Sequence, residues 1–373
     1  METTTTTTTT CLEFYSGVGG LHYSLRKARK GEDVKVIEAF DVNDLANVVY
    51  EFNHGIKPTS RDIGSLEAKD LDGKADAWLL SPPCQPYTRQ GLQRGSEDPR
   101  AQSFIKLLDK LGDLECKPSY LLIENVVGFE ESETRNHLVD TMKRNNYTTQ
   151  EFLVSPIDLG VPYSRARYFC LAKISPLKFL RGENDFKISK GPPEVGKVPQ
   201  ECRPLKEYLS EELVFENYSE SSDLWAQCLV KSGVRKYLGA IDIVSPHSRR
   251  CCCFTKSYYK YYKGTGSLIA VNSVPLEDGQ RSFVEEDGTV HIQFSTVSSS
   301  EMDNLEKVED SLLDQLVLRY FTPREVANLH SFPSDFSFPE GITRKQRYSL
   351  LGNSLSVAVV AHLLEYLFQE GSG

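Results

Sequence analysis

The sequence predicts an α/β protein in which a mostly parallel sheet, covered by helices on both faces, is followed by a smaller second domain. Through about residue 173, short apolar runs alternate with segments of helical period, as in strands joined by crossover helices. From about residue 174, Pro, Gly, Lys and Glu mix without a clear period. We therefore expect the divisions 1–10, 11–173, 174–319 and 320–373, with the last segment returning to the first domain.

The individual elements follow from these runs. Apolar runs predict buried strands over residues 11–15, 34–40, 77–80, 120–123 and 168–172. Helical periods predict the intervening helices over 21–29, 44–52, 103–114 and 134–145. Pro323 suits the first turn of a helix over 325–330, and a final apolar helix covers 355–368. The threonine run over residues 3–10 predicts a disordered leader or the frayed start of the first strand.

The charge balance excludes a polycationic protein. With 43 Lys and Arg against 52 Asp and Glu in 373 residues, the formal net charge is −9, which excludes histone-like nucleic-acid binding but leaves room for a local basic patch. No stretch approaches about 18 uninterrupted apolar residues, and the N-terminus lacks the layout of a secretory signal. We expect a soluble protein with no membrane partner, in the cytoplasm, with the nucleus as a second candidate compartment.

The cysteines are expected to be reduced thiols. Their number, nine, is odd, and no Cys-x-x-Cys occurs. The adjacent Cys251, Cys252 and Cys253 cannot all face one metal from a regular strand, and no His or Cys pair at zinc-finger spacing supports them. We expect no metal site.

A glycine turn joins the first predicted strand to the first helix through YSGVGG (15–20). This arrangement brings backbone close to a nucleotide-like ligand, although the G-x-G-G spacing implies no pyrophosphate cradle and a plain turn is the alternative. Asp41, after the second strand, is placed to accept hydrogen bonds from ribose hydroxyls, unless it or Asn43 is a helix N-cap. Asp62 is placed to meet an adenine amino group, unless it is an exposed loop acid.

The next strands deliver reactive side chains to the same edge. In SPPCQP (81–86) two prolines stiffen the chain before Cys84, which favours a nucleophile over the alternative of a buried structural cysteine. Glu124 follows a predicted buried strand, where a carboxyl group is expected either to be paired with another group or to have a functional role, because burial of an unpaired charge is costly. Arg165 and Arg167, at period two, are predicted to share one face for planar or phosphate recognition, with an edge-strand salt-bridge pair as the alternative.

A basic and aromatic segment lies further along the chain. Residues 249–263 hold five basic residues, four tyrosines and no acids. Cations beside rings suit phosphates and unstacked bases. An exposed strand with ordinary surface tyrosines is the alternative.

Taken in order, these motifs resemble those of the cytosine-5 methyltransferases that use S-adenosylmethionine. The succession YSGVGG, Asp41, Asp62, PPCQP, ENV, SRAR and Gly352-Asn353-Ser354 covers nearly the whole chain. Within the family, the resemblance is strongest to small eukaryotic enzymes that act on transfer RNA, through CFTK (253–256), GTGS (264–267), LRYFTP (318–323) and QRY (346–348). The sequence departs from the family at Cys251 and Cys252, which extend a single-cysteine motif, and in its threonine leader. Val42 stands where bacterial DNA enzymes stack an aromatic residue on adenine.

The resemblance implies a Rossmann-like methyltransferase sheet over 11–173 and a target-recognition domain over 174–319. It implies S-adenosylmethionine as cofactor, S-adenosylhomocysteine as product, and methylation at C5 of cytosine 38 in the anticodon loop of aspartate tRNA. A monomer and weak binding of DNA are further expectations. Cys84 is implied to add to C6 of the base and Glu124 to hold and protonate N3, while Arg165 and Arg167 orient the base. The base that removes the C5 proton is not identified.

The resemblance also implies two sets of binding residues. Cofactor contacts are expected from Tyr15, Gly17, Val18, Gly19, Gly20, Asp41, Val42, Asp62, Ile63, Pro82, Asn353 and Ser354. Substrate contacts are expected from Gln85, Arg89, Arg249, Cys253, Phe254, Thr255, Lys256, Tyr258 and Lys260.

Two rival functions stay open. One is a DNA cytosine methyltransferase with the same chemistry, and the other is a non-catalytic nucleic-acid binder that has kept the fold. The short region of about 145 residues between SRAR and Tyr320, without a chromatin-reading extension, favours tRNA. A binder has no need of the complete set Cys84, Glu124, Arg165 and Arg167. A nicotinamide oxidoreductase is excluded by the spacing of the glycine turn.

Overall fold

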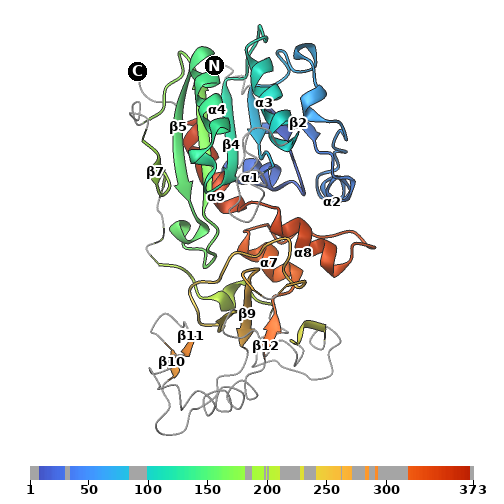
Figure 1. The fold of residues 1–373 in the computed structure, drawn as a ribbon, viewed down its shortest axis with the longest axis vertical. Helices are drawn as coiled ribbons and strands as arrows, with labels where there is room; N and C mark the ends of the chain where they lie inside the picture. Colours follow the sequence, from blue (N-terminus) through green and yellow to red (C-terminus); the bar gives the residue numbers. More distant parts are fainter. Residues whose placement is uncertain are drawn as a thin grey trace, which may run out of the picture.

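The structure is a computed structural model of the chain, drawn in Figure 1. It describes residues 8–29, 34–83, 99–180, 187–196, 199, 201–210, 227–230, 241–261, 263–270, 282–284, 290–292 and 318–369. A large sheet with helices on both sides forms one body, and a smaller body with α7, α8, β9 and β12 lies beside one end of it (Figure 1).

The large sheet has seven strands in the order β2-β1-β3-β4-β6-β5-β7. The bounds are β1 Thr9–Phe14, β2 Val34–Phe40, β3 Ala77–Leu80, β4 Tyr120–Val126, β5 Tyr147–Val154, β6 Arg167–Ile174 and β7 Ser189–Lys190. Neighbours from β2 to β4 pair in parallel, as does β5 with β7, whereas β6 is antiparallel to both β4 and β5. This parallel-rich sheet confirms the predicted α/β class.

Helices cover both faces of this sheet. The bounds are α1 Gly20–Ala28, α2 Asp44–His54, α3 Pro99–Leu111, α4 Glu133–Arg144, α7 Pro323–Leu329, α8 Arg344–Gly352 and α9 Val357–Phe368. Because side chains of a strand alternate between faces, Cys11 packs in the core with α1 and α9, while the next residue, Leu12, packs in the core with α3 and α4 (Figure 1). The last helix therefore does return to the sheet, as expected.

The C-terminal helices are apolar because they are core elements of the folded domain. Within the described chain, Arg344–Phe368 is long and apolar enough to cross a membrane by length and composition, yet 67% of its most apolar window is buried inside the protein. It also consists of two helices, since α8 ends at Gly352 and α9 begins at Val357. A buried core helix satisfies the same length and composition test.

Two features of the sheet differ from the sequence prediction. Strand β5 was not predicted, because its interior polar residues mask the apolar pattern. Glu151 is buried yet paired, accepting hydrogen bonds from Arg135 Nε (2.8 Å) and the Tyr168 hydroxyl (2.6 Å). The connection from β5 to β6 holds the short 3-10 helix Pro156–Leu159 and no α-helix that could serve as a crossover, and β6 runs antiparallel to β5.

The smaller body is built on a three-stranded sheet in the order β12-β9-β8. Its strands are β8 Asp242–Val244, β9 Ser267–Ala270 and β12 Leu318–Tyr320, and a separate pair is β10 Ser282–Val284 with β11 Val290–Ile292. A fully buried ion pair, Arg319 Nη1 to Glu325 Oε2 at 2.8 Å, joins β12 to α7, which starts at Pro323, two residues before the expected start. The divisions at 173/174 and 319/320 stay a proposal.

A buried polar cluster lies under the glycine turn. The Tyr50 hydroxyl lies 2.7 Å from Oε2 of Glu13 and 2.9 Å from Nδ1 of His22, whose ring stacks on that of His54 with centroids 4.0 Å apart. Burial raises the pKa of Glu13 to about 8 and lowers the pKa values of His22 and His54 to about 4 and about 3. At pH 7 the carboxyl group is therefore protonated and both rings are neutral.

This cluster predicts a stability maximum near pH 6.5. Between pH 4.5 and 6.5 the unfolded chain binds one proton on each of His22 and His54 that the folded protein lacks, while the folded protein keeps one proton on Glu13 that the unfolded chain has lost. The unfolded chain therefore binds one proton more than the folded protein, and the free energy of unfolding rises with pH. From pH 6.5 to 8, Glu13 is the one member of this cluster whose protonation differs between the folded and the unfolded chain, and its contribution to the free energy of unfolding falls by about 1–2 kcal/mol. Urea unfolding of Glu13→Gln at pH 6.5 and 8.5 is expected to show no such fall; an identical fall in the variant and the wild type would contradict this assignment.

Candidate active site

The carboxyl ends of four neighbouring parallel strands, β2, β1, β3 and β4, meet at one edge of the large sheet. Open α/β sheets bind their ligands at this edge, because the loops that follow the strands converge there. The glycine turn, Asp41 and the segment 81–83 follow β1, β2 and β3, and Glu124 lies near the carboxyl end of β4. The edge is therefore the candidate active site.

The glycine turn after β1 has a shape that requires glycine. Gly19 has a left-handed φ of 86°, and a Cβ there would lie 2.1 Å from Nε2 of His54. The Gly19 amide donates to the Ser16 carbonyl (2.9 Å), which closes the turn. No side chain caps the start of α1 at Gly20, so its first amides face the edge without a side-chain acceptor. A helix start of this kind suits a ligand with negative charge.

Asp41 ties the glycine turn to the loop after β2. Its carboxylate accepts hydrogen bonds from the amides of Gly17 and Asn43, both at 2.8 Å. Burial raises the pKa of Asp41, and these hydrogen bonds oppose that rise. The N-cap of α2 is Asn43, which accepts from the Ala46 amide, so capping does not occupy Asp41. Beside it, the Val42 side chain is 66% exposed, an apolar surface next to a carboxylate.

Asp62 and Ile63 follow the connection after α2. Asp62 is exposed and accepts from the Gly64 amide at 3.1 Å, which caps the short 3-10 helix Ile63–Ser65. The Ile63 side chain is buried in the core beneath α3. The cap accounts for one carboxylate oxygen, and the expected contact of Asp62 with an adenine amino group stays a prediction.

The loop 352–354 brings the C-terminal segment to the glycine turn. A Cβ on Gly20 would lie 3.3 Å from Oγ of Ser354, so the two segments touch. On its other side, a Cβ on Gly352 would lie only 2.2 Å from the amide nitrogen of Lys256, which restricts this position to glycine. Asn353, between them, is exposed. The loop thus separates the expected cofactor residues from the segment 253–256.

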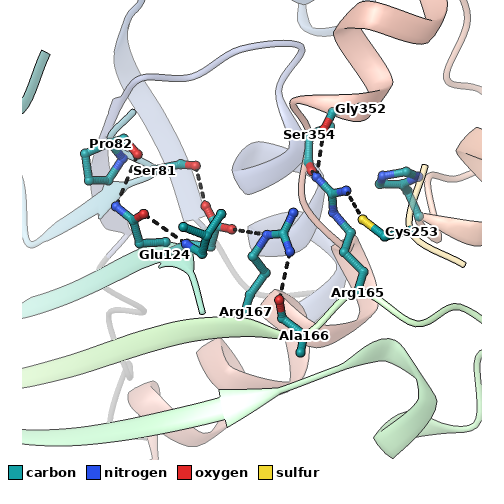
Figure 2. A network of polar contacts seen from close by, with 12 residues as sticks. Ser81, Pro82, Glu124, Arg165, Ala166, Arg167, Cys253, Gly352 and Ser354 are labelled. Atoms are coloured by element: carbon teal, nitrogen blue, oxygen red, sulfur yellow. Dashed lines mark hydrogen bonds and ion pairs between the residues drawn. The ribbon is translucent and has the colours of Figure 1, made fainter. Parts of the chain in front are cut away.

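Glu124 is the centre of a polar network at the ends of β3 and β4 (Figure 2). Its side chain is 91% buried, and it accepts a hydrogen bond from Oγ of Ser81 at 2.6 Å. Nε of Arg167 lies 3.4 Å from its other oxygen. Arg167 stands opposite Val126 in the β4–β6 register, so it is a diagonal neighbour of Glu124 on the same face. Asn125 Nδ2 donates to the Pro82 carbonyl at 3.3 Å, which holds the start of the 82–83 segment.

Arg165 and Arg167 lie close together, because both guanidinium groups form a hydrogen bond with the sulfur of Cys253, but the two residues do not both belong to a strand. Strand β6 begins only at Arg167, so the period-two argument does not extend to Arg165. Arg165 is 4% exposed, and its guanidinium turns away from Glu124 toward Gly352, Ser354 and Cys253 (Figure 2). Nη1 and Nη2 of Arg165 are engaged by these groups, whereas Nε is buried and has no hydrogen-bond partner among the described residues, so direct orientation of the base by Arg165 stays a prediction.

Three expected residues lie outside the described part of the chain. These are the nucleophile Cys84 and the substrate contacts Gln85 and Arg89. The last described residues before them are Ser81, Pro82 and Pro83, and the first two are held by Glu124 and Asn125. The roles of Cys84, Gln85 and Arg89 stay predictions.

The basic segment separates into buried and exposed side chains. Phe254 (1% exposed) and Tyr258 (3%) belong to the core of the smaller body, and the Tyr258 hydroxyl donates to the Ser267 carbonyl, so the expectation that these rings offer a face to the substrate is corrected. Lys256 and Lys260 are exposed, while Thr255 is half-buried. Arg249 Nη1 lies 3.1 Å from Glu201 and donates to the Cys202 carbonyl, so a phosphate would compete with these partners.

Of the tyrosines that the sequence predicted to offer rings to bases, Tyr259 (40% exposed) and Tyr261 (55%) are the described ones that keep open rings. Sequence reasoning missed two other side chains, Arg344 and Ser81. Lys260 lies over Tyr261, and Arg344, from the start of α8, lies 5.7 Å from the Tyr259 ring centroid. Ser81 was likewise missed as a partner of Glu124. Its place directly after an apolar strand, opposite the strand that carries Glu124, is the signal that could have identified it.

The arrangement at the edge supports acid–base and nucleophilic chemistry by side chains. Among the described residues, no group of three or more His, Cys, Asp and Glu could hold a metal ion. The described residues bring a buried carboxylate, a guanidinium and a hydroxyl together beside a glycine turn suited to a nucleotide-like ligand.

Known proteins match the chain over almost its whole length. The C-5 cytosine-specific DNA methylase family matches residues 9–369. The chain is 38% identical over 408 residues to the Mus musculus tRNA (cytosine(38)-C(5))-methyltransferase, covering 97% of this chain and 94% of that protein. It is 35% identical over 391 residues to a Dictyostelium discoideum DNA (cytosine-5)-methyltransferase, covering 95% and 93%.

Solved structures resemble the fold over the same length. The crystal structure of S. pombe Dnmt2 methyltransferase matches with a TM-score of 0.73 and 32% identity, covering 96% of this chain and 98% of that one. A triple mutant of Spodoptera frugiperda DNMT2 matches with a TM-score of 0.77 and 34% identity, covering 97% and 100%.

Proposed function

The chain belongs to the C-5 cytosine-specific DNA methylase family, and on that premise we propose that it methylates C5 of cytosine 38 in the anticodon loop of aspartate tRNA. Family membership makes it a cytosine-C5 methyltransferase with a nucleic-acid substrate. The proposed parts are the methyl donor S-adenosylmethionine, the tRNA and its target base, and a covalent bond between Cys84 and the base. The observation that carries the proposal is the buried Glu124 network beside the glycine turn.

The residues at the edge fit S-adenosylmethionine. A Cβ at Gly17 would meet nothing within 4 Å, so the glycine turn is open at this position, and the uncapped start of α1 suits the carboxylate of the donor. The Asp41 carboxylate retains lone pairs for ribose hydroxyls, and the exposed Val42 offers apolar contact to adenine. When bound, S-adenosylmethionine supplies an electrophilic methyl group for C5 of the base.

C5 of an aromatic pyrimidine is a weak nucleophile, and covalent catalysis makes it reactive. Addition of the Cys84 thiolate to C6 makes C5 enamine-like, and loss of the C5 proton after methylation lets the Cys84 sulfur leave. Glu124 is placed by Ser81 and Arg167 so that its carboxyl group can hold the N3 and N4 edge of the base and carry the proton at N3. Arg167 sits beside this carboxyl group, where it positions Glu124 and the reacting edge together.

A transfer RNA loop suits the substrate surface. An unpaired loop base leaves its stack at the least cost, about a few kcal/mol. The exposed rings of Tyr259 and Tyr261 and the exposed Lys256 and Lys260 offer stacking and phosphate contacts on one segment next to loop 352–354. The mouse relative carries the tRNA cytosine-38 activity in its name, which supports the same base here.

The direct test of this function is incubation with labelled methyl donor and either total tRNA or duplex DNA, followed by mapping of the modified base. We expect label at C5 of cytosine 38 of aspartate tRNA and far less in DNA. Label confined to duplex DNA would replace this proposal with the DNA methyltransferase that the Dictyostelium relative's name describes.

The basic segment predicts a specific salt dependence of tRNA binding. We expect Lys256→Ala and Lys260→Ala to weaken binding and to lower the slope of log affinity against log salt by about 0.7 for each phosphate that the variant no longer neutralises. The measurement is filter binding or fluorescence anisotropy at several salt concentrations. Lys35→Ala, at an exposed position of the edge strand β2, is the matched control and should keep the wild-type slope. Unchanged slopes in both segment variants would exclude this surface.

A further inference from the structure

Arg165 is a buried cation whose hydrogen bonds join separate segments of the chain. Nη1 lies 3.1 Å from Sγ of Cys253 and donates to the Phe254 carbonyl at 3.1 Å, while Nη2 donates to the carbonyls of Gly352 (2.9 Å) and Ser354 (Figure 2). The carbonyl partners carry no net charge, and Nε has no hydrogen-bond partner among the described residues. A guanidinium that is 96% buried is costly unless an anion lies close to it.

The neighbouring titratable groups do not supply this anion. Tyr163 and His330 both face the guanidinium, and their side chains lie 3.2 Å apart. Burial raises the pKa of Tyr163 and lowers the pKa of His330, so both are neutral at pH 7. Cys251 donates its thiol proton to the Pro162 carbonyl, and burial holds its pKa well above the ordinary value.

Two charged neighbours remain, and they are engaged with each other. Arg167 pairs with Glu124, which also accepts from Ser81. Glu124 pairs directly with Arg167, and its charge also acts on Arg165, so one carboxylate faces two guanidinium groups. Among the described residues around the guanidinium, the sulfur of Cys253 is the group left to carry the second negative charge.

We propose that Cys253 is a half-buried thiolate that forms an ion pair with Arg165, and that this pair is a positioning device joining the segment 253–256 to loop 352–354. The catalytic consequence rests on the proposed function, whereas the ion pair itself does not. Since loop 352–354 touches both the glycine turn and Lys256, the pair fixes the cofactor side and the substrate side relative to each other.

The local electrostatics agree with this geometry. Burial raises the pKa of the Cys253 thiol, but the charges of Arg165 and Arg167 and their hydrogen bonds outweigh it, so the pKa lies below its ordinary value. The adjacent Cys252 has the opposite surroundings, since burial and Asp242 raise its pKa to about 11. Two neighbouring cysteines thus provide a thiolate and its matched control.

The test is a pH titration of thiolate ultraviolet absorbance in the full chain, comparing the wild type with Cys253→Ser and Cys252→Ser. The wild type minus Cys253→Ser difference is expected to show one thiolate at pH 7, whereas Cys252→Ser should equal the wild type there. A Cys253 thiolate that forms only above pH 9 would overturn the proposal. Should Cys253→Ser fail to fold, a thiolate-selective disulfide reagent on the wild type, followed by peptide mapping, applies the same criterion: Cys253 is expected to react at pH 7 much faster than Cys252, and equal rates would overturn it.

Activity gives a second readout that separates charge from packing. Cys253→Ser keeps the size but not the charge, and we expect kcat to fall about tenfold or more with a smaller change in KM for tRNA. Cys253→Asp restores the charge and should recover part of kcat. Equal kcat values for the wild type and Cys253→Ser would contradict the positioning role. A protein without tRNA methylation but with the thiolate at pH 7 would contradict the proposed function and leave the ion pair standing.

Discussion

Replacement of Cys84 by alanine is expected to reduce methylation of tRNA by at least about 10³-fold, because loss of a catalytic nucleophile removes the covalent route altogether. C5 of the base then lacks the enamine character that lets it take a methyl group. Binding of tRNA and of S-adenosylmethionine should change little, since the turn, Asp41 and the basic segment are untouched. Single-turnover kinetics with labelled donor measure the effect on the chemical step.

Cys116→Ala is the matched control for this variant. Cys116 is an exposed free cysteine on the connection before β4, away from the candidate active site. It should keep wild-type turnover, which separates loss of the nucleophile from a general effect of removing a thiol. Turnover by Cys84→Ala comparable with that of Cys116→Ala would end the covalent scheme.

Glu124→Gln is expected to lower kcat by about 10²- to 10⁴-fold, the range that general acid–base catalysis contributes. Glutamine keeps the size of the side chain and can still accept from Ser81, but it cannot carry a proton between its oxygens and N3 of the base. It also leaves Arg167, whose side chain is 17% exposed, without its ion-pair partner. Rates of the chemical step and thermal unfolding should be measured together.

The control for this variant is Glu131→Gln, an exposed glutamate at the end of the short helix Phe129–Glu131 just after β4. It makes the same change from carboxylate to amide at a residue that does not belong to the polar network of Ser81, Glu124 and Arg167. We expect wild-type kcat from Glu131→Gln and only a modest loss of stability from Glu124→Gln. A Glu124→Gln enzyme with wild-type kcat would remove Glu124 from the chemistry.

The sequence was sufficient to predict those parts of the site that depend on strand order. The carboxyl ends of neighbouring parallel strands lie at the same edge of a sheet, so the sequence alone predicts that the glycine turn, Asp41 and Glu124 lie near one another. The motifs in series indicated the family for the same reason, because their order and spacing extend over nearly the whole chain.

The features that could not be predicted depend on contacts between distant segments. The local pattern of Arg165 is that of a strand residue, and only the approach of loop 352–354 and Cys253 shows why its charge is buried. Tyr258 looks like its exposed neighbours Tyr259 and Tyr261, yet packing against β12 and α8 places it in the core. Strand β5 was hidden because Glu151 is compensated by Arg135, which is 16 residues away in the sequence.

The most direct measurement of the central claim is covalent trapping with aspartate tRNA that carries 5-fluorocytidine at position 38. Fluorine replaces the proton that must leave C5, so the sulfur cannot depart after methyl transfer. With S-adenosylmethionine present, mass spectrometry of the digested adduct is expected to find the methylated fluoropyrimidine on the peptide that contains Cys84, and none with Cys84→Ala. Turnover of unmodified tRNA without any such adduct, or an adduct at another residue, would contradict the account.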